Sequence, residues 1–464
     1  MTPRIVEAAT LAADAPHVSV AIVGAGACGL TAAIALRETG IDCVLLERDA
    51  TPAGSTALSS GFIPAAATPW QRSAGVDDSA ERFAADIQAK ARGQAAAHLV
   101  RTYAQASAPA LALLARHGLR FELLDGFLYP GHSVRRMHTL PERTGAALMV
   151  ALERAATGLG ADIVASALVR ELCCDAGGRV HGVGFERPGG SVEHLRCDVL
   201  LLACNGFGGN AAMVAELLPE MRTAPFAGHA GNDGSAIAWG RAMGARLADL
   251  GGYQGHGSWA VPQGALVSWA LLMEGGVQVN ALGQRLHDET QGYSEAAVKV
   301  LAQPGGVVWD VFDDTLLALA RTFPDFNAAE NAGALRSAAD VSALARIVGC
   351  NAATLGATLA AVAPGDNDAF GRRFTRVLGA PLHAVKVTGA LFHTQGGLDI
   401  DAQCRVVRKD GSPFPNLLAA GGAARGVSGN AVWGYLSGNG LLSAVAGGLI
   451  AAQVAARLLD RQRR

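Results

Sequence analysis

The sequence predicts an α/β fold in two lobes, and two observations carry that expectation. A strand, a glycine-rich turn, a helix and a second strand follow one another within residues 17–47, an order typical of a Rossmann-like unit. The chain has 464 residues, more than one simple core accommodates, and its texture changes between about 256 and 383. We therefore expect a Rossmann-like domain in two parts, 1–255 and 384–464, with a second, α+β domain inserted at 256–383.

The first element expected is the strand His17–Val23, and the turn after it has the spacing G-x-G-x-x-G. In that turn Gly24 allows the tight bend, Gly26 lets the backbone approach a pyrophosphate, and Gly29 lets the following helix pack on the strand. The N-terminus of this helix offers free N–H groups to phosphate oxygens. The second strand ends at Glu47, whose carboxylate can accept hydrogen bonds from ribose hydroxyls. The sequence therefore predicts a dinucleotide site.

The later elements follow from local patterns. A stretch rich in Gly, Ser, Thr and Pro predicts a loop over 52–71, and periodicity predicts helix over 78–124. Thr144 is a suitable N-cap for the next helix, and the last helix is expected to begin near Asn439. Apolar runs predict strands at 162–172, 180–186, 198–203, 388–400 and 417–422.

The composition limits the class of protein. Hydrophobic residues make up 50% of the chain and charged residues only 17%, which excludes a disordered chain. The 38 Lys and Arg nearly balance the 40 Asp and Glu, so the chain lacks the basic surface that nucleic-acid binding needs. We expect no nucleic-acid partner.

The cysteines and the apolar segments predict the compartment. None of the eight cysteines forms a C-x-x-C pair, so zinc and haem motifs lack support and no metal is expected. Scattered free thiols fit a reducing cytoplasm. The N-terminus lacks the apolar core of a signal peptide. Leu441–Leu459 is rich in Ala and Gly and contains Gln453 and Arg457, so we expect a buried helix there and no membrane span.

Several longer segments carry a family resemblance. They are VGAGACGLTAA (23–33), LLER (45–48), GSTALSSG (54–61), LLACNGFGGN (201–210), GNDGSAIAWGRAMGA (231–245), YQGHG (253–257), VNALGQRLHDE (279–289), LFHTQGGLDID (391–401), AAGG (419–422) and SGNGLLSA (437–444). In this order they resemble the flavoproteins of the fumarate reductase and succinate dehydrogenase superfamily. The resemblance covers nearly the whole chain, and its most specific pieces are His-Thr-x-Gly-Gly and Gly-x-Arg-Leu-x-x-Glu in combination.

The resemblance implies an FAD-binding domain, a capping domain and non-covalent FAD, because the segment 54–61 lacks the histidine through which some relatives attach flavin. Ser55 and Thr56 would meet the N5/O4 edge, and the N-terminus of the last helix would face the flavin pyrimidine. The residues that the resemblance places at the cofactor are Gly24, Gly26, Cys28, Gly29, Glu47, Arg48, Ser55, Thr56, Ser60, Gly61, Leu168, Ala203, Asn205, Gly206, Asp233, Gly421, Asn439, Leu441 and Leu442.

The resemblance also implies the chemistry. Members of this superfamily move a hydride between flavin N5 and one carbon of a C–C or C=C bond next to a carbonyl or carboxylate. His256 and His393 match positions that bind substrate oxygen, and Arg285 matches the proposed proton donor. Because a guanidinium rarely yields a proton, Arg285 is better cast as a stabiliser of an enolate. The alternatives are a core histidine for His256 and, for Arg285, an ion pair with Asp288 or Glu289.

The chain departs from the fumarate reductases at three positions. Their carboxylate-binding arginine is replaced by Tyr435, and the Glu and Arg of their proton path are replaced by Trp269 and Leu272. A tyrosine at this place resembles the ketosteroid Δ1-dehydrogenase branch, in which a tyrosine hydroxyl and a backbone N–H hold a ketone oxygen. Tyr435 with the N–H of Gly440 can form such an oxyanion hole. The alternative is a buried tyrosine packed beside Trp433.

One loop favours an acidic substrate. The segment 129–145 contains Arg135, Arg136, His138 and Arg143, and arginine binds carboxylates with two parallel hydrogen bonds. If this loop covers the flavin, a keto acid becomes a plausible substrate. The alternative is that these cations pair with local acids.

The sequence therefore predicts an FAD-dependent oxidoreductase that acts on CH–CH bonds, favoured as the α,β-dehydrogenation of a cyclic ketone or keto acid. Tyr129, Tyr253 and Tyr293 are further candidates for the base. The expected partners are a small carbonyl or carboxylate substrate and an unidentified electron donor or acceptor. One alternative is a soluble enoate reductase like fumarate reductase. Another is a non-catalytic dinucleotide-binding protein, which would be colourless rather than yellow.

Overall fold

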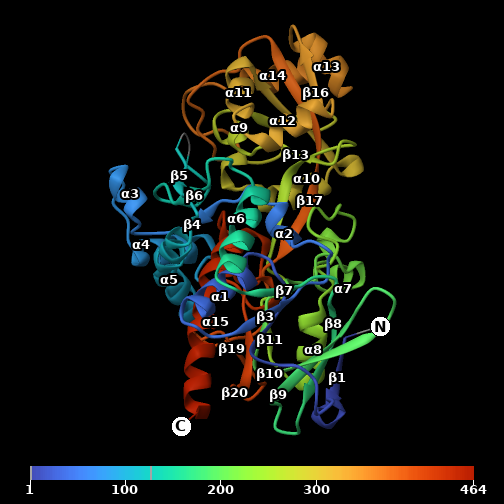
Figure 1. Cartoon of the computed structure of the whole chain (residues 1–464). Coiled ribbons are helices and arrows are strands. Elements are labelled where there is room, and N and C mark those ends of the chain that lie inside the picture. Colours follow the sequence, from blue (N-terminus) through green and yellow to red (C-terminus); the bar gives the residue numbers. More distant parts are fainter. Residues whose placement is uncertain (1–2, 126–127, 464) are drawn as a thin grey trace.

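The computed structural model describes residues 3–125 and 128–463, which form two lobes, each built on its own sheet (Figure 1). The first lobe contains a nine-stranded sheet and the second a six-stranded sheet. The second lobe, yellow and orange in Figure 1, stands above the first; the C-terminus lies at the far end of the first lobe and the N-terminus at its side. The predicted α/β fold, a Rossmann-like domain with a capping domain, is confirmed.

Four parallel strands form the centre of the large sheet: β2 (His17–Val23), β3 (Cys43–Leu46), β7 (Asp162–Val164) and β10 (Val192–Leu202). β2 lies between β3 and β10. Its residues after His17 are all buried, which explains the unbroken apolar run, because a central parallel strand is covered on both faces. Two helices cover this centre, α1 (Ala27–Glu38) and α15 (Asn439–Arg463), and they pack against each other. The two ends of the chain therefore build one core.

The rest of the large sheet comes from five strands: β1 (Arg4–Glu7), β8 (Leu168–Cys174), β9 (Val180–Glu186), β19 (Arg405–Val407) and β20 (Pro413–Ala419). β8, β9 and β10 form an antiparallel meander, and β20 pairs with β10 in parallel. β1 pairs in parallel with β8. The first residues, which the sequence analysis left without structure, thus supply an edge strand.

Five further helices of the first lobe are α4 (Ala80–Lys90), α5 (Ala97–Arg116), α6 (Gly145–Gly158), α7 (Ala211–Leu217) and α8 (Ser235–Met243). The helix predicted over 78–124 is two helices, because Arg92 and Gly93 adopt positive φ values of 50° and 75° between them. Thr144 caps α6 as predicted, since its side chain accepts a hydrogen bond from the N–H of Ala147.

The segment predicted as a loop over 52–71 contains short elements. They are α2 (Gly54–Ala57), β4 (Ile63–Pro64) and the start of α3 (Pro69–Ser73). A reciprocal capping box between Thr68 and Gln71 begins α3. β4 joins β5 (Glu122–Leu123) and β6 (Met137–Thr139) in a small antiparallel sheet.

The second lobe is built on β12 (Tyr253–Ala260), β13 (Ala265–Leu266), β14 (Val277–Val279), β15 (Val307–Asp313), β16 (Leu335–Ala338) and β17 (Leu382–Thr394). Its helices are α9 (Ala270–Met273), α10 (Tyr293–Leu301), α11 (Asp314–Ala320), α12 (Pro324–Asn331), α13 (Val341–Val348) and α14 (Ala352–Ala360). β12 and β17 are antiparallel neighbours that pair Gln254 with His393. These two strands lead back to the first lobe, where β11 (Leu247–Ala248) and β18 (Gly397–Leu398) pair.

Among the described residues, one helix, Asn439–Gln462, is long and apolar enough to cross a membrane. Of its most apolar window, 61% is buried inside the protein. It packs on α1 and α5, as a core helix does.

Candidate functional site

One cavity runs from the glycine turn of the first lobe to the second lobe. At its first end it is lined by Gly24, Gly26, Glu47 and Arg48. At its other end it is lined by His256, Tyr293, His393 and Tyr435, together with the cap residues Leu266, Ser268, Trp269, Ala270, Phe323 and Asp325. The predicted dinucleotide turn and three of the four predicted catalytic residues therefore face one continuous space.

The glycine turn has no room for side chains. Gly24 has a φ of +102°, and a Cβ there would lie 2.7 Å from the carbonyl oxygen of Ala203. A Cβ on Gly29 would lie 2.0 Å from the carbonyl oxygen of Gly24. Gly29 does not line the cavity but lets α1 pack against the turn. At the N-terminus of α1, the N–H of Ala27 donates to Oγ1 of Thr56 at 3.1 Å.

Glu47 is fixed at the cavity wall by two backbone donors. Its Oε2 accepts from the N–H of Ala25 at 2.9 Å, and its Oε1 accepts from the N–H of Asp49 at 3.0 Å. The neighbouring Arg48 donates to the carbonyl oxygen of Gly231 at 2.6 Å and pairs with Asp233 at 3.3 Å. A rigid carboxylate beside a glycine turn suits the two hydroxyls of a ribose.

Ser55 connects the loop 54–61 to the far side of the cavity. Its Oγ accepts from Nδ2 of Asn205 at 3.1 Å and from Nδ2 of Asn232 at 2.8 Å. Most of the residues predicted at the cofactor line the same cavity. They are Gly24, Gly26, Cys28, Glu47, Arg48, Ser55, Thr56, Ser60, Gly61, Leu168, Ala203, Asn205, Asp233, Gly421 and Leu441.

Four predicted residues, Gly29, Gly206, Asn439 and Leu442, lie outside the lining. A Cβ on Gly206 would lie 2.0 Å from Oγ1 of Thr394, so this glycine serves close packing. Asn439 is fully buried and its Nδ2 donates to Ser428 Oγ at 3.0 Å, while Leu442 belongs to the hydrophobic core. These residues support the wall rather than form it.

The lining fits a dinucleotide with a ring system at its far end. The glycine cradle and the helix N-terminus suit a pyrophosphate. The N-terminus of α15 reaches the cavity through Gly440 and Leu441. Near that N-terminus, the buried Oδ1 of Asn439 and Oγ of Ser443 have no hydrogen-bond partner among the described residues. The free N–H groups of a helix N-terminus suit an acceptor ring that becomes negatively charged.

The reactive end is a cluster of aromatic rings. His256 stacks on Tyr293 with centroids 4.8 Å apart, Tyr293 lies 6.2 Å from Tyr435, and Tyr435 lies 5.5 Å from His393. Burial raises the pKa of Tyr435 well above its usual range, and the backbone N–H groups of Gly440 and Gly438 offset part of that rise. A tyrosine that keeps its proton beside backbone donors is a hydrogen-bond donor for a carbonyl oxygen.

His256 is a donor and not a base. The N–H of Ser258 donates to its Nδ1 at 3.1 Å, so the ring hydrogen lies on Nε2. Burial lowers the pKa of His256 to about 3, which keeps the ring neutral. It offers an N–H to the cavity, as substrate binding requires, but no free lone pair for a proton.

His393 is the same Nε2–H tautomer as His256, but a different hydrogen bond fixes it. Asn439 donates to Ser428, the Ser428 hydroxyl donates to Oε1 of Gln395 at 2.9 Å, and Nε2 of Gln395 donates to Nδ1 of His393 at 3.0 Å. This chain of donors leaves the hydrogen on Nε2 of His393. Burial lowers the pKa of His393 to about 4. Both histidines of the site are therefore neutral donors.

Tyr293 is the acceptor of the cluster. Burial raises its pKa, and hydrogen bonds to its oxygen from Ser437 and Tyr435 lower it in part. Tyr129 also lines the cavity. Tyr253 does not, because its hydroxyl donates to Glu220 at 2.9 Å in a separate cluster. Tyr293 thus has two donors directed at its oxygen.

The structure separates Arg285 from the cavity, and the predicted catalytic role for this residue is not supported. Its Nε and Nη2 bind Glu289 at 3.0 and 2.7 Å, and Nη1 binds Asp368. Glu289 is also bound by Arg372 at 2.6 Å. The guanidinium is thus fully used by buried acids, which is the ion-pair alternative. The spacing of the motif did not reveal Asp368, because it lies far along the chain.

The arginines of the loop 129–145 also pair with acids, and His138 contacts a hydroxyl. Arg136 is fully buried between Asp78 and Asp86. Arg135 binds Asp125, Arg143 binds Glu122, and Nε2 of His138 lies 2.8 Å from the Thr68 hydroxyl. None of these side chains lines the cavity among the described residues. The loop holds the wall in place and does not supply a carboxylate site.

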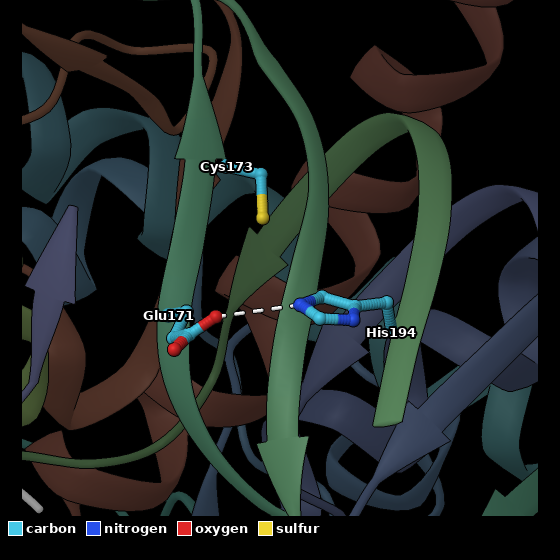
Figure 2. A group of neighbouring side chains, drawn as sticks. All are labelled: Glu171, Cys173 and His194. Carbon is cyan, nitrogen blue, oxygen red and sulfur yellow. Dashed lines mark hydrogen bonds and ion pairs between the residues drawn. The ribbon is translucent and has the colours of Figure 1, made fainter. Parts of the chain in front are cut away.

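Figure 2 shows three potential metal ligands on the large sheet, away from the cavity: Glu171 and Cys173 of β8 and His194 of β10. Nε2 of His194 lies 3.4 Å from Glu171, and Arg4 binds the other oxygen of that carboxylate. Burial raises the pKa of Cys173 to about 11, so its thiol is protonated. The carboxylate is satisfied by the arginine and the histidine, and we assign no metal here.

Three residues of the reactive end were not predicted to act there. Gln395 and Ser437 lie inside the recognised motifs but carried no distinct signal. Asp325 lies on the cap wall of the cavity, at the second position of α12. An acid in the first turn of a helix is common, so the sequence alone could not mark it.

A family model described as the FAD binding domain matches residues 19–441. The NADH:fumarate oxidoreductase of Klebsiella pneumoniae is 28% identical over 449 residues, covering 94% of this chain and 47% of that protein. The chain thus spans about half the length of that relative. Among solved structures, a flavocytochrome c3 fumarate reductase in an open conformation is 27% identical, with a TM-score of 0.79, covering 96% of this chain and 78% of that one.

A second solved structure matches over its whole length. The 3-ketosteroid-Δ4-(5α)-dehydrogenase of Rhodococcus jostii RHA1, in complex with 4-androstene-3,17-dione, is 25% identical with a TM-score of 0.78. The alignment covers 98% of this chain and 100% of that one.

Proposed function

The chain belongs to the FAD-binding superfamily of fumarate reductase and succinate dehydrogenase flavoproteins, and from that premise we propose that it desaturates a cyclic ketone between the carbons α and β to the carbonyl. The coarser statement, an FAD-dependent oxidoreductase that acts on carbon–carbon bonds next to an activating group, holds for its relatives of both kinds. FAD supplies the hydride acceptor when it is bound.

This proposal rests on the charges of the residues that line the cavity. Among the described lining residues there is no lysine and only one arginine, Arg48, which lies at the nucleotide end and is paired. The reactive end offers neutral donors and one carboxylate, Asp325. A dicarboxylate such as fumarate would enter without a counter-ion and beside a like charge, which is costly in a buried site. A neutral ketone needs only the hydrogen-bond donors that are present.

The residues divide the work between two atoms of the substrate. Tyr435 holds the carbonyl oxygen, where negative charge develops. Its hydroxyl donates to Tyr293 when no substrate is bound, and it turns to the carbonyl when a substrate binds; the N–H of Gly440, which bonds to the Tyr435 oxygen, polarises this donor. Tyr293 takes the proton from the α-carbon, and the Ser437 hydrogen bond to its oxygen opposes the rise in its pKa that burial causes. His256 and His393 fix the ring of the substrate with their Nε2–H groups. The aromatic walls exclude water from the charged transition state.

The test is a reoxidation experiment with the holoprotein. The flavin is reduced with dithionite under anaerobic conditions, and fumarate or cyclohex-2-enone is added while flavin absorbance is followed. We expect the enone to restore the oxidised spectrum and fumarate to leave it unchanged. Tyr435→Phe should slow the enone reaction by about 10²–10³-fold, since it removes one oxyanion donor. Faster reoxidation by fumarate, with no effect of Tyr435→Phe, would support the fumarate reductase alternative instead.

A further inference from the structure

Asp325 is a carboxylate on the cap wall of the cavity. It is the second residue of α12, and the Ser60 hydroxyl of the first lobe donates to its Oδ2 at 2.8 Å. This bond crosses from one lobe to the other, at the reactive end of the cavity. The side chain lines the cavity.

No ion pair between described residues includes Asp325, and burial raises its pKa, with only the Ser60 hydrogen bond opposing that rise. Two acids of the chain show the usual compensation: Asp78 pairs with Arg136, and Glu289 pairs with Arg285 and Arg372. A carboxylate has room for about four hydrogen bonds, and Asp325 has a single donor among the described residues. Its spare capacity points into the cavity.

The position of Asp325 relative to Tyr435 determines which part of the substrate Asp325 contacts. Tyr435, Tyr293, Tyr129 and Asp325 all line the same cavity, and the rings of Tyr293 and Tyr435 lie 6.2 Å apart. A substrate held by its carbonyl at Tyr435 can therefore present a second group to the carboxylate.

We propose that Asp325 selects the substrate by accepting a hydrogen bond from a hydroxyl or ammonium group at the end away from the carbonyl. This inference rests on the proposed ketone dehydrogenase function. It narrows the substrate class from cyclic ketones in general to those with a donor opposite the ketone. A donor satisfies the carboxylate, whereas an apolar substituent leaves it buried without a partner.

The test compares three probes with the oxidised holoprotein: 4-hydroxycyclohexanone, 4-aminocyclohexanone and 4-methylcyclohexanone. Dissociation constants are measured anaerobically by stopped flow, from the perturbation of flavin absorbance that precedes any flavin reduction. We expect the hydroxyl and amino ketones to bind at least about tenfold more tightly than the methyl ketone. Asp325→Asn should remove that preference and weaken the amino ketone most, because it loses a charge partner. The tighter binder of the hydroxyl and amino ketones shows whether Asp325 prefers a hydroxyl or an ammonium group.

Two variants serve as controls. Asp314→Asn makes the same change in the first turn of the neighbouring α11, where the side chain is 67% exposed and outside the cavity, and should leave all three constants unchanged. Ser60→Ala removes the protein donor, keeps the carboxylate and should preserve the preference. Since no ion pair between described residues includes Asp325, Asp325→Asn should not lower the unfolding temperature, which guards against a folding defect.

The binding and reoxidation experiments test the role of Asp325 and the ketone dehydrogenase function separately. Equal affinity for the three ketones, including no detectable binding of any, overturns the role of Asp325, as does an Asp325→Asn variant that keeps the preference. Neither result bears on whether cyclohex-2-enone reoxidises the reduced flavin. Failure of that reaction overturns the proposed function, while the binding preference is read independently of turnover.

Discussion

At the scale of single residues, the site depends on where hydrogen atoms lie. The backbone N–H next to His256 and the side-chain amide next to His393 both donate to Nδ1, so each ring presents Nε2–H to the cavity. For His393 the donor is Gln395, the variable position of the His-Thr-x-Gly-Gly motif. The motif predicted the histidine, but its tautomer is set by Ser428 and Asn439, which only the folded chain brings to Gln395.

Gln395→Leu tests this arrangement, because leucine keeps the bulk and removes the donor. We expect the Nδ1 of His393 to lose its partner and the Nδ1–H tautomer, which can donate to the Thr394 carbonyl oxygen, to become populated. The measurement is the pair of ¹⁵N shifts of the His393 ring in labelled holoprotein. Gln395→Glu is the matched variant, since its acceptor should also draw the hydrogen to Nδ1. Unchanged ¹⁵N shifts in both variants would show that Gln395 does not fix the ring.

At the scale of elements, the small sheet and the loop 129–145 hold one wall of the cavity. Arg136 is the anchor: it binds Asp78 and Asp86 with no exposed side-chain area, and it lies over the Phe83 ring. The same loop carries His132, whose Nε2 lies 2.9 Å from the Ser437 carbonyl oxygen next to the reactive tyrosines. The sequence showed that this loop is rich in arginine, but the partners of Arg136 lie on α4 and in the segment before α4, so their pairing could not be read from spacing.

Arg136→Met should destabilise the protein by about 3–5 kcal/mol, because two buried carboxylates lose their cation. Arg135→Met is the matched control: its partner Asp125 is 81% exposed, and the expected cost is about 0–1 kcal/mol. The measurement is the free energy of unfolding from urea titration of the FAD-saturated protein. Equal costs for the two variants would contradict the anchoring role of Arg136.

At the scale of the whole molecule, the sequence predicted the architecture because it is locally encoded. The βαβ unit of residues 17–47 and the N-cap at Thr144 depend on neighbours in the chain, and both were correct. The edge strand β1 was missed, because its pairing with β8 is a contact over more than 160 residues. For the same reason only one of the two acids that bind Arg285 was predicted. Glu289 lies four residues away in the sequence, whereas Asp368 lies 83 residues away.

The whole molecule also has a predictable dependence on pH, because many of its histidines are buried. Burial lowers the pKa to about 4 for His132, His138, His287 and His393 and to about 3 for His256. In the unfolded chain these groups take up protons near pH 6.5. Between about pH 6.5 and 4 the unfolded state therefore binds more protons, and stability is present above that window and lost as the pH falls through it.

Asp310 acts in the opposite direction, since burial raises its pKa to about 7 and the folded state takes up its proton first. The histidines outnumber it, so we expect the free energy of unfolding to fall by more than about 2 kcal/mol from pH 7.5 to pH 5 at saturating FAD. Asp310→Asn removes one opposing group and should make the fall steeper. The measurement is urea unfolding of both proteins at the two pH values. Greater stability at pH 5 than at pH 7.5 would mean that the buried histidines are charged in the folded protein, and the neutral donors assigned to the active cavity would then have to be reassigned.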